Sequence, residues 1–159
     1  MERTAVFPGS FDPFTIGHES IVKRAIPLFE KIIIGIGQNV SKSNFFPLET
    51  RIKWINDIFE YEEKVTVMSF KGLTVDFARN VNAGYILRGL RTAADFEYER
   101  AIGQVNKKMY PEIETVFLLT APEYTPVNST IVRDIIRNGG DASKFLPKNI
   151  NLIDYDFNR

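Results

Sequence analysis

Residues 9–18 read Gly-Ser-Phe-Asp-Pro-Phe-Thr-Ile-Gly-His, and their types and order suit the binding of an anion. Gly9 lets a ligand approach the backbone closely, and Ser10 offers a hydroxyl. The run leads into a segment of helical spacing, and the free N–H groups and dipole at a helix N-terminus attract phosphate. His18, the only histidine in the chain, is expected in the first helical turn, where its imidazole N–H points at the same anion. The run predicts a phosphate-binding loop; the alternative is a glycine-rich connector that contains a histidine by chance.

Residues 88–91 read Arg-Gly-Leu-Arg at the end of an expected strand, and residues 95–99 read Asp-Phe-Glu-Tyr-Glu. Arg88 and Arg91 supply several donors, and a guanidinium matches the oxygens of a phosphate bidentately. A solvated turn before a helix is the alternative when these residues are taken alone. The pair predicts a second group of cations for an anionic ligand.

Lys42 stands between two serines in a loop that follows another expected strand. A flexible lysine in this place can reach a phosphate in a crevice shared by neighbouring loops. A lone loop lysine is more often simply solvated, and its residue type alone favours that alternative.

Residues 124–130 read Tyr-Thr-Pro-Val-Asn-Ser-Thr and precede the last expected helix, with Arg133 and Arg137 one and two turns further on. Small polar side chains at a helix start can cap the helix, or they can bind phosphate together with its free N–H groups. The residue types leave both interpretations open.

Short apolar runs alternate with longer segments of helical spacing, which indicates βαβ units. Strands are expected at residues 4–7, 31–36, 65–69, 85–88 and 115–119. Helices are expected at residues 17–29, from Pro47 to 59, at 73–80, at 93–109, and from residue 128 or 129 to the glycines at 139–140. Three successive isoleucines at 32–34 suit a parallel strand that is covered on both faces. The pattern predicts one α/β domain over residues 1–159, with a doubly wound, parallel, five-stranded sheet.

Two of the expected helices carry apolar stripes. In the first helix, Ile21, Ala25 and Leu28 share one stripe. In the fourth, the stripe consists of Ala94, Tyr98, Ala101, Val105 and Met109. Ligands of parallel sheets bind outside the carboxyl ends of the strands, so the loops there are expected to form the site. These loops are residues 8–18, 37–46, 70–74, 89–92 and 120–130.

The composition bounds the class of protein. Twenty basic and twenty acidic residues cancel, which argues against a whole-surface electrostatic grip on nucleic acid or on a membrane. The chain has no cysteine, so disulfides, thiolate metal sites and a cysteine nucleophile are excluded. It has no apolar run of about 18 residues and no signal-peptide pattern. We expect a soluble cytoplasmic protein with no nucleic-acid or membrane partner.

Residues 9–18 resemble the signature of the nucleotidyltransferase superfamily, G-[ST]-F-D-P-x-T-x-G-H, with residues 15–18 as its TxGH form. This form is similar to the phosphopantetheine adenylyltransferase family more than to the cytidylyltransferases, which usually carry histidine at the first position. Residues 88–91 and 95–99 together resemble a block of the same family. Lys42 falls on the phosphate-binding lysine of that family, although many relatives have a further basic residue in place of Ser43. Relatives also carry I-S-S-[ST] where this chain has Val-Asn-Ser-Thr at 127–130.

The resemblance implies a Rossmann-like nucleotidyltransferase fold and transfer of the adenylyl group of ATP to 4′-phosphopantetheine, with dephospho-coenzyme A and pyrophosphate as products. It also implies Mg²⁺ accompanying ATP, with no metal site on the protein, and assembly as a homohexamer. By resemblance, the catalytic residues are His18, Lys42 and Arg91. The acceptor-binding residues are Ser10, Lys42, Thr74 and Arg88. The ATP-binding residues are Ser10, Phe11, His18, Gly89, Leu90, Arg91, Glu99, Tyr124, Thr125, Pro126, Val127, Asn128, Ser129 and Thr130.

Nucleotidyl transfer to a phosphate brings two anions together, so the protein must mainly neutralise charge and align the attack. The sole histidine lies in the expected phosphate loop, so no histidine is left to partner a serine in a triad. Three alternatives remain: a nucleotidyltransferase for another acceptor, such as nicotinamide mononucleotide or glycerol phosphate; a catalytically silent nucleotide-binding module; and a structural βα domain that uses its aromatic residues for partner contacts.

Overall fold

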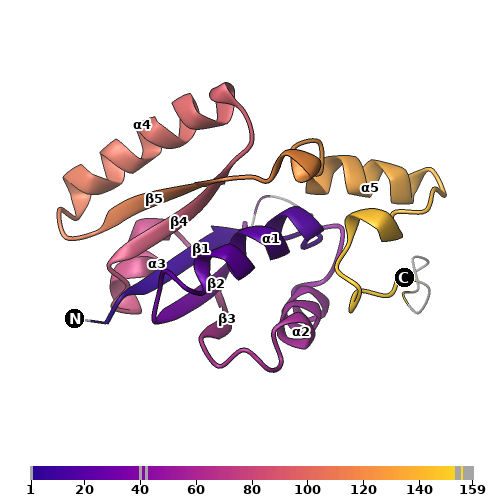
Figure 1. The fold of residues 1–159 in the computed structure, drawn as a ribbon, viewed down its shortest axis with the longest axis horizontal. Helices are drawn as coiled ribbons and strands as arrows, with labels where there is room; N and C mark the ends of the chain where they lie inside the picture. Colours follow the sequence, from indigo (N-terminus) through magenta and orange to yellow (C-terminus); the bar gives the residue numbers. More distant parts are fainter. Residues whose placement is uncertain (1, 40, 42, 153–154, 156–159) are drawn as a thin grey trace.

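The structure is a computed structural model that describes residues 2–39, 41, 43–152 and 155. Lys42, one of the predicted site residues, lies outside the described residues. Five parallel strands form one sheet in the order β3-β2-β1-β4-β5 (Figure 1). The strands are β1 (Thr4–Gly9), β2 (Lys31–Gly37), β3 (Val65–Phe70), β4 (Tyr85–Leu90) and β5 (Glu114–Leu119). All of the predicted strands are confirmed, each slightly longer than expected.

Helices connect the strands in the expected alternation. They are α1 (Ile16–Ala25), α2 (Leu48–Ile58), α3 (Thr74–Asn80), α4 (Ala93–Met109) and α5 (Ser129–Arg137), with short 3₁₀ turns η1 (Pro122–Tyr124) and η2 (Ser143–Phe145). Asn128 caps α5, since its side-chain Oδ1 accepts the N–H of Ile131 at 2.9 Å. Of the two caps considered from the sequence, the structure selects Asn128.

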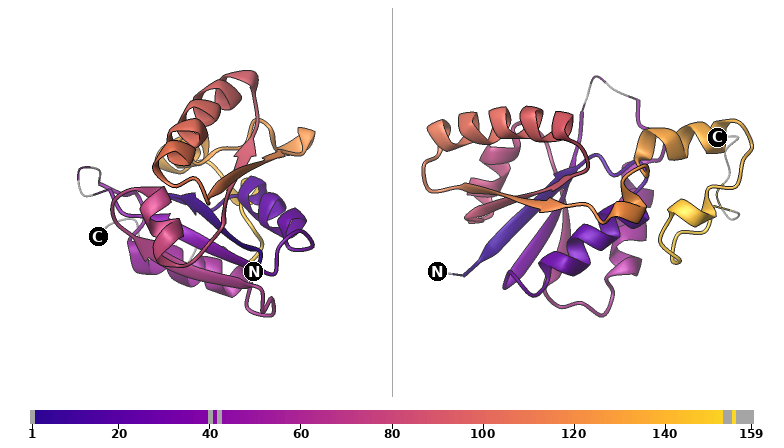
Figure 2. Two further views of the ribbon diagram at one scale, coloured as in Figure 1. Left: turned by 90° about the vertical axis from the view of Figure 1, so that its left-hand side faces the viewer. Right: turned by 45° about the horizontal axis from the view of Figure 1, so that its top comes forward.

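The sheet is covered on both faces, as predicted for a doubly wound fold. Val6 lies between Ile33 and Ile86 in the parallel register, and these three side chains pack against Val75 and Phe77 of α3. The alternating residues of the same strands, such as Ala5, Phe7, Ile32 and Ile34, pack instead in a second core with α1, α2 and α5. Figure 2 shows α3 and α4 on one side of the sheet and α1 on the other.

The first helix is shorter than the sequence pattern indicated, and one expectation about its buried stripe is wrong. Ile21 and Ala25 are buried, but Leu28 is 46% exposed. The helix ends at Ala25, because Pro27 has no amide hydrogen with which to continue the helical ladder. Leu28 therefore lies in a turn that leaves the helical stripe.

Little of the apolar stripe of the long helix α4 is buried. Tyr98, Val105 and Met109 are 69%, 56% and 44% exposed, and Glu99 is the only buried residue of the helix. The contacts of α4 with β4 and β5 use its other face, where Gly103 lies close to Thr115 and Phe96 packs on Phe117. The periodic stripe thus faces solvent in a single copy of the chain.

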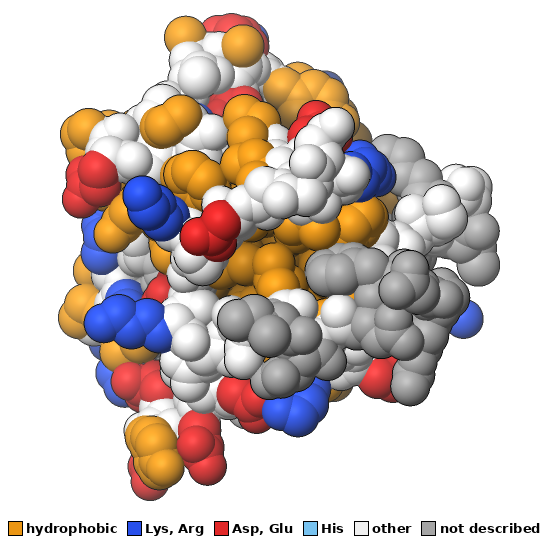
Figure 3. All heavy atoms as spheres, turned by 90° about the vertical axis from the view of Figure 1, so that its right-hand side faces the viewer, with side chains coloured by type: hydrophobic (Ala, Val, Ile, Leu, Met, Phe, Trp, Pro, Cys, Tyr) orange, Lys and Arg blue, Asp and Glu red, His pale blue; other side chains and the backbone are white. Residues whose placement is uncertain are grey.

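Apolar side chains also gather at the end of the molecule that carries α5 and the residues after it (Figure 3). Phe45, Ile136 and Phe145 are partly buried there against the larger core, and the guanidinium of Arg137 lies over the Phe45 ring. This packing fixes α5 against the loop that precedes α2. No helix among the described parts of the chain is long and apolar enough to span a membrane.

The strand order fixes where a ligand can bind. The chain leaves β1 toward β2 and β3 on one side, and later returns to place β4 and β5 on the other side of β1. Loops that leave β1 and β4 therefore diverge to opposite faces and open a crevice at the carboxyl ends of these strands.

Candidate active site

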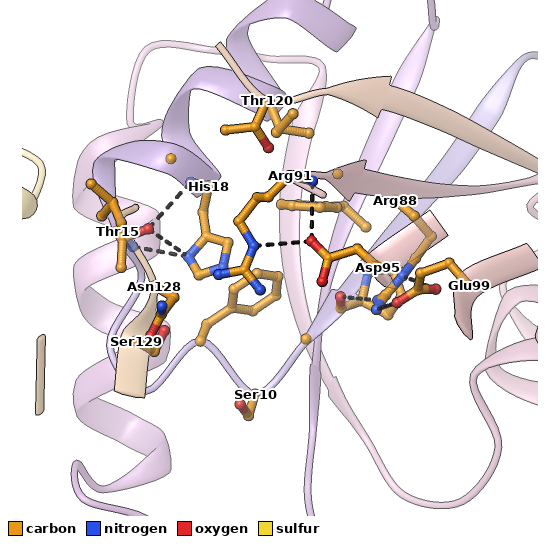
Figure 4. A pocket seen from close by; sticks show the side chains of 18 residues that line it. Ser10, Thr15, His18, Arg88, Arg91, Asp95, Glu99, Thr120, Asn128 and Ser129 are labelled. Carbon is orange, nitrogen blue, oxygen red and sulfur yellow. Dashed lines mark hydrogen bonds and ion pairs between the residues drawn. The ribbon is translucent and has the colours of Figure 1, made fainter. Parts of the chain in front are cut away.

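A cavity of about 340 Å³ lies at the carboxyl ends of β1 and β4 (Figure 4), within the size range of small-molecule sites. Many of the residues predicted from the sequence line it: Ser10, Phe11, His18, Arg88, Gly89, Arg91, Glu99, Val127, Asn128 and Ser129. Leu90, Tyr124, Thr125, Pro126 and Thr130 do not line it. The structure thus brings three separated motifs of the sequence to one place.

His18 is held at the start of α1 by a reciprocal capping interaction. Its Nδ1 accepts the backbone N–H of Thr15 at 3.0 Å, and its own backbone N–H donates to the Thr15 hydroxyl at 3.4 Å. Because a backbone N–H can only donate, Nδ1 must be bare and the proton must reside on Nε2. The fold therefore selects the tautomer in which His18 offers one N–H.

The same ring is kept neutral by its surroundings. Burial, together with the positive charges of Arg91 and Arg88 as smaller causes, lowers the pKa of His18 from 6.5 to about 4. The imidazole packs against Phe11 and Phe14, with ring centroids 5.0 and 5.3 Å away. At neutral pH His18 is a hydrogen-bond donor and carries no charge.

Arg88 is fixed on both sides by its partners. Its Nε donates to Glu99 Oε2 at 2.9 Å, its Nη2 donates to the second oxygen of the same carboxylate, and its Nη1 donates to the Pro8 carbonyl at 2.9 Å. Glu99 was predicted to bind ATP; it lines the cavity, and both of its carboxylate oxygens accept from Arg88. Such bidentate pairs fix a guanidinium in orientation as well as in position.

Arg91 is anchored through Asp95. Its backbone N–H and its Nε donate to Asp95 Oδ2 at 3.1 and 3.2 Å, which leaves the two Nη groups for a ligand. Figure 4 shows the Arg91 side chain on the cavity side, extended in the direction of the His18 ring. Arg91 and His18 can therefore donate to one anionic group together.

The segment before α5 caps the helix and also borders the cavity, and phosphate binding by it stays a prediction. Asn128 caps the helix, and the Ser129 hydroxyl donates to the Pro13 carbonyl at 2.8 Å, which ties α5 to the loop after β1. Val127, Asn128 and Ser129 also line the cavity. The N-termini of α1 and α5 thus border the same space, where their dipoles favour negative charge.

Two further hollows adjoin the cavity. One of about 100 Å³ and one of about 440 Å³ both include Pro8, Thr74 and Arg88 in their linings. Arg88 lines all three spaces and so stands where they meet. Thr74, predicted to bind the acceptor, lies in the two adjoining hollows.

Metal-ligating side chains do not gather in this region. Among the described residues, no group of three or more His, Cys, Asp and Glu side chains is placed to hold a metal ion. The two carboxylates of the cavity, Asp95 and Glu99, are each paired with an arginine. The described part of the site is therefore a set of fixed donors, suited to a polyanion such as a nucleoside triphosphate.

Known proteins are similar to this chain over nearly its full length. The cytidylyltransferase-like family matches residues 6–135. A phosphopantetheine adenylyltransferase from Flavobacterium psychrophilum is 51% identical over 150 residues, which cover 94% of this chain and 99% of the relative. The chain belongs to the phosphopantetheine adenylyltransferase family.

Other phosphopantetheine adenylyltransferases agree with this placement, among them that of Leptospira biflexa, 48% identical over 147 residues and covering 92% of each chain. Among solved structures, a bifunctional NMN adenylyltransferase/ADP ribose pyrophosphatase from Francisella tularensis matches with a TM-score of 0.71 at 19% identity. That match covers 96% of this chain and 47% of the other, and at this identity it supports the fold alone.

Sequence reasoning missed several residues of this candidate site. Asp95 was noted within its motif but was given no role, although its spacing of four residues from Arg91 is a recognisable signal for an ion pair. Thr15 was noted as part of the TxGH motif, but its hold on the His18 ring depends on the ring rotamer, for which the sequence carries no signal. Ile21 and Thr120 also line the cavity, and nothing in their local pattern marks them.

Proposed function

We propose that this chain transfers the adenylyl group of ATP to 4′-phosphopantetheine, forming dephospho-coenzyme A and pyrophosphate in the synthesis of coenzyme A. The observation that carries the proposal is the position of Arg88. Its guanidinium is fixed by Glu99 and Pro8 where the 340 Å³ cavity meets the hollows beside Thr74, and in this proposal the cavity binds ATP. An acceptor phosphate bound by Arg88 lies next to the ATP site while its organic arm extends toward Thr74. The names of the relatives, at 47–51% identity, support the same acceptor.

In this proposal the chemistry needs no general base. The second pKa of a phosphate monoester is about 6, so the acceptor is already largely dianionic near neutral pH. One of its oxygens attacks the α-phosphorus of ATP; a new P–O bond forms while the bond to the bridging oxygen breaks, and pyrophosphate leaves. The protein aligns these groups and stabilises the charge that builds up on the α-phosphate.

His18 and Arg91 carry out that stabilisation in the proposal. Nε2–H of His18 donates to a non-bridging oxygen of the α-phosphate, and Nδ1 cannot act as a base because it is occupied by the Thr15 N–H. Arg91 adds positive charge through its free Nη groups. Lys42 is a further catalytic and acceptor-binding residue of the prediction; it lies outside the described residues, and its role stays a prediction.

Mg²⁺ enters the proposal with ATP. In proteins this ion usually retains several waters and binds through one or two carboxylates and substrate phosphates, and here it would supply positive charge beside the phosphates of ATP. With Asp95 and Glu99 engaged by arginines, we expect its ligands to be mainly phosphate oxygens and water.

We also propose a cytoplasmic homohexamer. The exposed apolar stripe of α4, with Tyr98, Val105 and Met109, is supporting evidence, because burial against another copy removes this apolar surface from water. Light scattering on the purified protein tests the assembly: a mass of six chains of 18.2 kDa supports the proposal, and a monomer contradicts it.

The experiment for the reaction is pyrophosphate release with MgATP across three acceptors: 4′-phosphopantetheine, nicotinamide mononucleotide and glycerol phosphate. We expect release with phosphopantetheine alone. Release of pyrophosphate with either of the other two acceptors indicates another nucleotidyltransferase reaction, and no release with any of the three acceptors favours a catalytically silent nucleotide-binding module.

A further inference from the structure

Arg51, in the first turns of α2, is the most deeply buried charged side chain described, with 1% of its surface exposed, and it lines none of the three hollows of the site. Its Nε donates to the Phe46 carbonyl at 3.0 Å, and its Nη1 donates to the Ser10 carbonyl at 2.6 Å. One guanidinium therefore joins the end of the loop that follows β2 to the phosphate-binding loop that follows β1.

Asp12 makes the reverse connection between the same two loops. Its two carboxylate oxygens accept the backbone N–H groups of Phe45 and Phe46 at 2.7 and 2.8 Å, and the residue is 6% exposed. A third contact comes from α5, where Arg133 Nη1 donates to the Asp12 carbonyl at 2.7 Å. Arg51 and Arg133 thus hold the loop at residues 10–12 through its backbone carbonyls, and the Asp12 carboxylate binds this loop to residues 45 and 46.

Fold stability alone is a weak reason for a buried arginine. Burial lowers the pKa of Arg51, which is the sign of an unfavourable environment for its charge, although Asp12 acts in the opposite direction. Arg51 Nη2 is also the one buried side-chain nitrogen or oxygen, in the described part of the chain, without a hydrogen-bond partner. The contacts that Arg51 makes to backbone carbonyls therefore call for another explanation.

The carbonyl that Arg51 holds belongs to a peptide in the site. In a trans peptide the C=O and the following N–H point in opposite directions, so a Ser10 carbonyl turned toward Arg51 turns the Phe11 N–H away from it. Phe11 has a φ of 47°, a left-handed conformation that is rare for a bulky residue and that persists only where the surroundings enforce it. Both Ser10 and Phe11 line the cavity.

We infer that Arg51, together with Asp12, is a positioning residue for adenylyl transfer: it clamps the loops after β1 and β2 so that the Ser10 hydroxyl and the Phe11 N–H face the reacting phosphates. The inference rests on the proposed function for its catalytic consequence. It adds a residue outside the cavity to those that determine turnover. It also assigns to Arg51 and Asp12 the coupling of residues 45 and 46 to the phosphate-binding loop.

The test uses Arg51→Lys in the full-length protein. Lysine keeps the positive charge but has no planar fork with which to join two carbonyls. Because a misplacement of about 1 Å costs about 100-fold in rate, kcat per folded molecule is expected to fall roughly 10- to 100-fold, while KM for ATP changes by less than about threefold. Lys53→Ala is the matched control, since Lys53 is a cation of the same helix that lies at the surface and pairs with Asp57. It is expected to turn over like the wild type.

Two further measurements separate positioning from loss of fold. In Arg51→Ala, millimolar guanidinium is expected to raise kcat at least about tenfold, while the same salt leaves the kcat of Lys53→Ala unchanged. Amide hydrogen exchange of peptides covering residues 9–15 and 43–47 is expected to speed up in Arg51→Lys and not in Lys53→Ala. If Arg51→Lys does not fold, Asp12→Asn is used in its place, since its amide nitrogen cannot accept the second N–H; the same exchange and a lower kcat are expected.

The inference is overturned if the folded variant retains kcat within about twofold of the wild type, or if its lost activity equals its unfolded fraction. Failure of the proposed function gives a different result, namely no product from the wild type with phosphopantetheine. The positioning role of Arg51 is then tested by amide hydrogen exchange of the two loops and by the affinity for ATP. Unchanged exchange in Arg51→Lys overturns the inference, and faster exchange with weaker binding of ATP supports it.

Discussion

The ionisation of His18 can be measured without interference, because the chain contains no other histidine. We predict that the ring in the folded, ligand-free protein has a pKa of about 4, well below the 6.5 of a solvated histidine. Burial against the aromatic side chains is the main cause, followed by the charges of Arg91 and Arg88. The hydrogen bond from Thr15 further predicts that the proton resides on Nε2.

The magnitude follows from proton linkage. The neutral ring is favoured in the folded state, so its contribution to the free energy of unfolding is fully present above a pH of about 6.5 and is lost as the pH falls toward 4. With a pKa of 6.5 in the unfolded chain and about 4 in the folded protein, the ring lowers the free energy of unfolding by about 2 kcal/mol when the pH falls from about 7 to about 5. Other titrating groups contribute as well, so the comparison must be made with a variant that lacks only this ring.

Nitrogen NMR on protein labelled with ¹⁵N-histidine reports the pKa and the tautomer directly. Urea unfolding of the wild type and of His18→Asn then gives the energetic difference, because asparagine retains an acceptor for the Thr15 N–H and does not titrate. The difference between the two proteins is expected to shrink by about 2 kcal/mol from about pH 7 to about pH 5. A pKa near 6.5, a proton on Nδ1, or a pH-independent difference refutes the reasoning about this site.

Four other predictions concern single side chains. His18→Ala is expected to remain folded by circular dichroism and to lose roughly 100- to 1000-fold in kcat, as for other donors to a transition-state anion. Glu99→Gln frees one side of Arg88, so steady-state kinetics are expected to show a KM for phosphopantetheine that is roughly tenfold higher, the effect of about 1.4 kcal/mol. Asn128→Ala removes the cap of α5 and is expected to lower the free energy of unfolding by about 1 kcal/mol in urea titrations. Val105→Glu places a charge on the exposed stripe of α4 and is expected to reduce the oligomer mass in light scattering.

Each of these variants has a result that contradicts its premise. Near-normal turnover in His18→Ala removes this ring from the reaction. An unchanged acceptor KM in Glu99→Gln means that the carboxylate does not hold Arg88 in its binding position. Equal unfolding curves for Asn128→Ala mean that the cap contributes nothing measurable, and an unchanged mass for Val105→Glu places the interface on another surface.

Much of the fold could be predicted from the sequence because its signals are local. Continuous apolar runs such as Ile32–Ile34 mark strands covered on both faces, and their alternation with helical segments indicates a parallel sheet. The strand order was not predicted, because β4 pairs with β1 and not with β3, the strand before it in the chain. The end of α1 was predicted too late, since the apolar spacing continues to Leu28 while Pro27 interrupts the backbone ladder. Periodicity alone also gave no indication that the stripe of α4 faces solvent, because a stripe packs equally well against a sheet or against another chain.

The candidate site also has a part that the sequence could predict and a part that it could not. The motifs around His18 and Arg88 could be found because phosphate-binding loops have a recognisable composition at strand ends. The partners of these residues are set by tertiary packing: Asp12 binds amides more than 30 positions away, and Arg51 binds a carbonyl 41 positions away. Such contacts join loops that only the folded sheet brings together, and no local sequence pattern predicts them.

The most direct test of the central claim is a product analysis with 4′-phosphopantetheine and MgATP, in parallel on the wild type and on His18→Ala. Mass spectrometry of the quenched reaction is expected to show dephospho-coenzyme A and pyrophosphate in equal amounts from the wild type, and almost none of either from the variant at matched ATP occupancy. Pyrophosphate without dephospho-coenzyme A, or equal product from both proteins, contradicts the account of adenylyl transfer at this site.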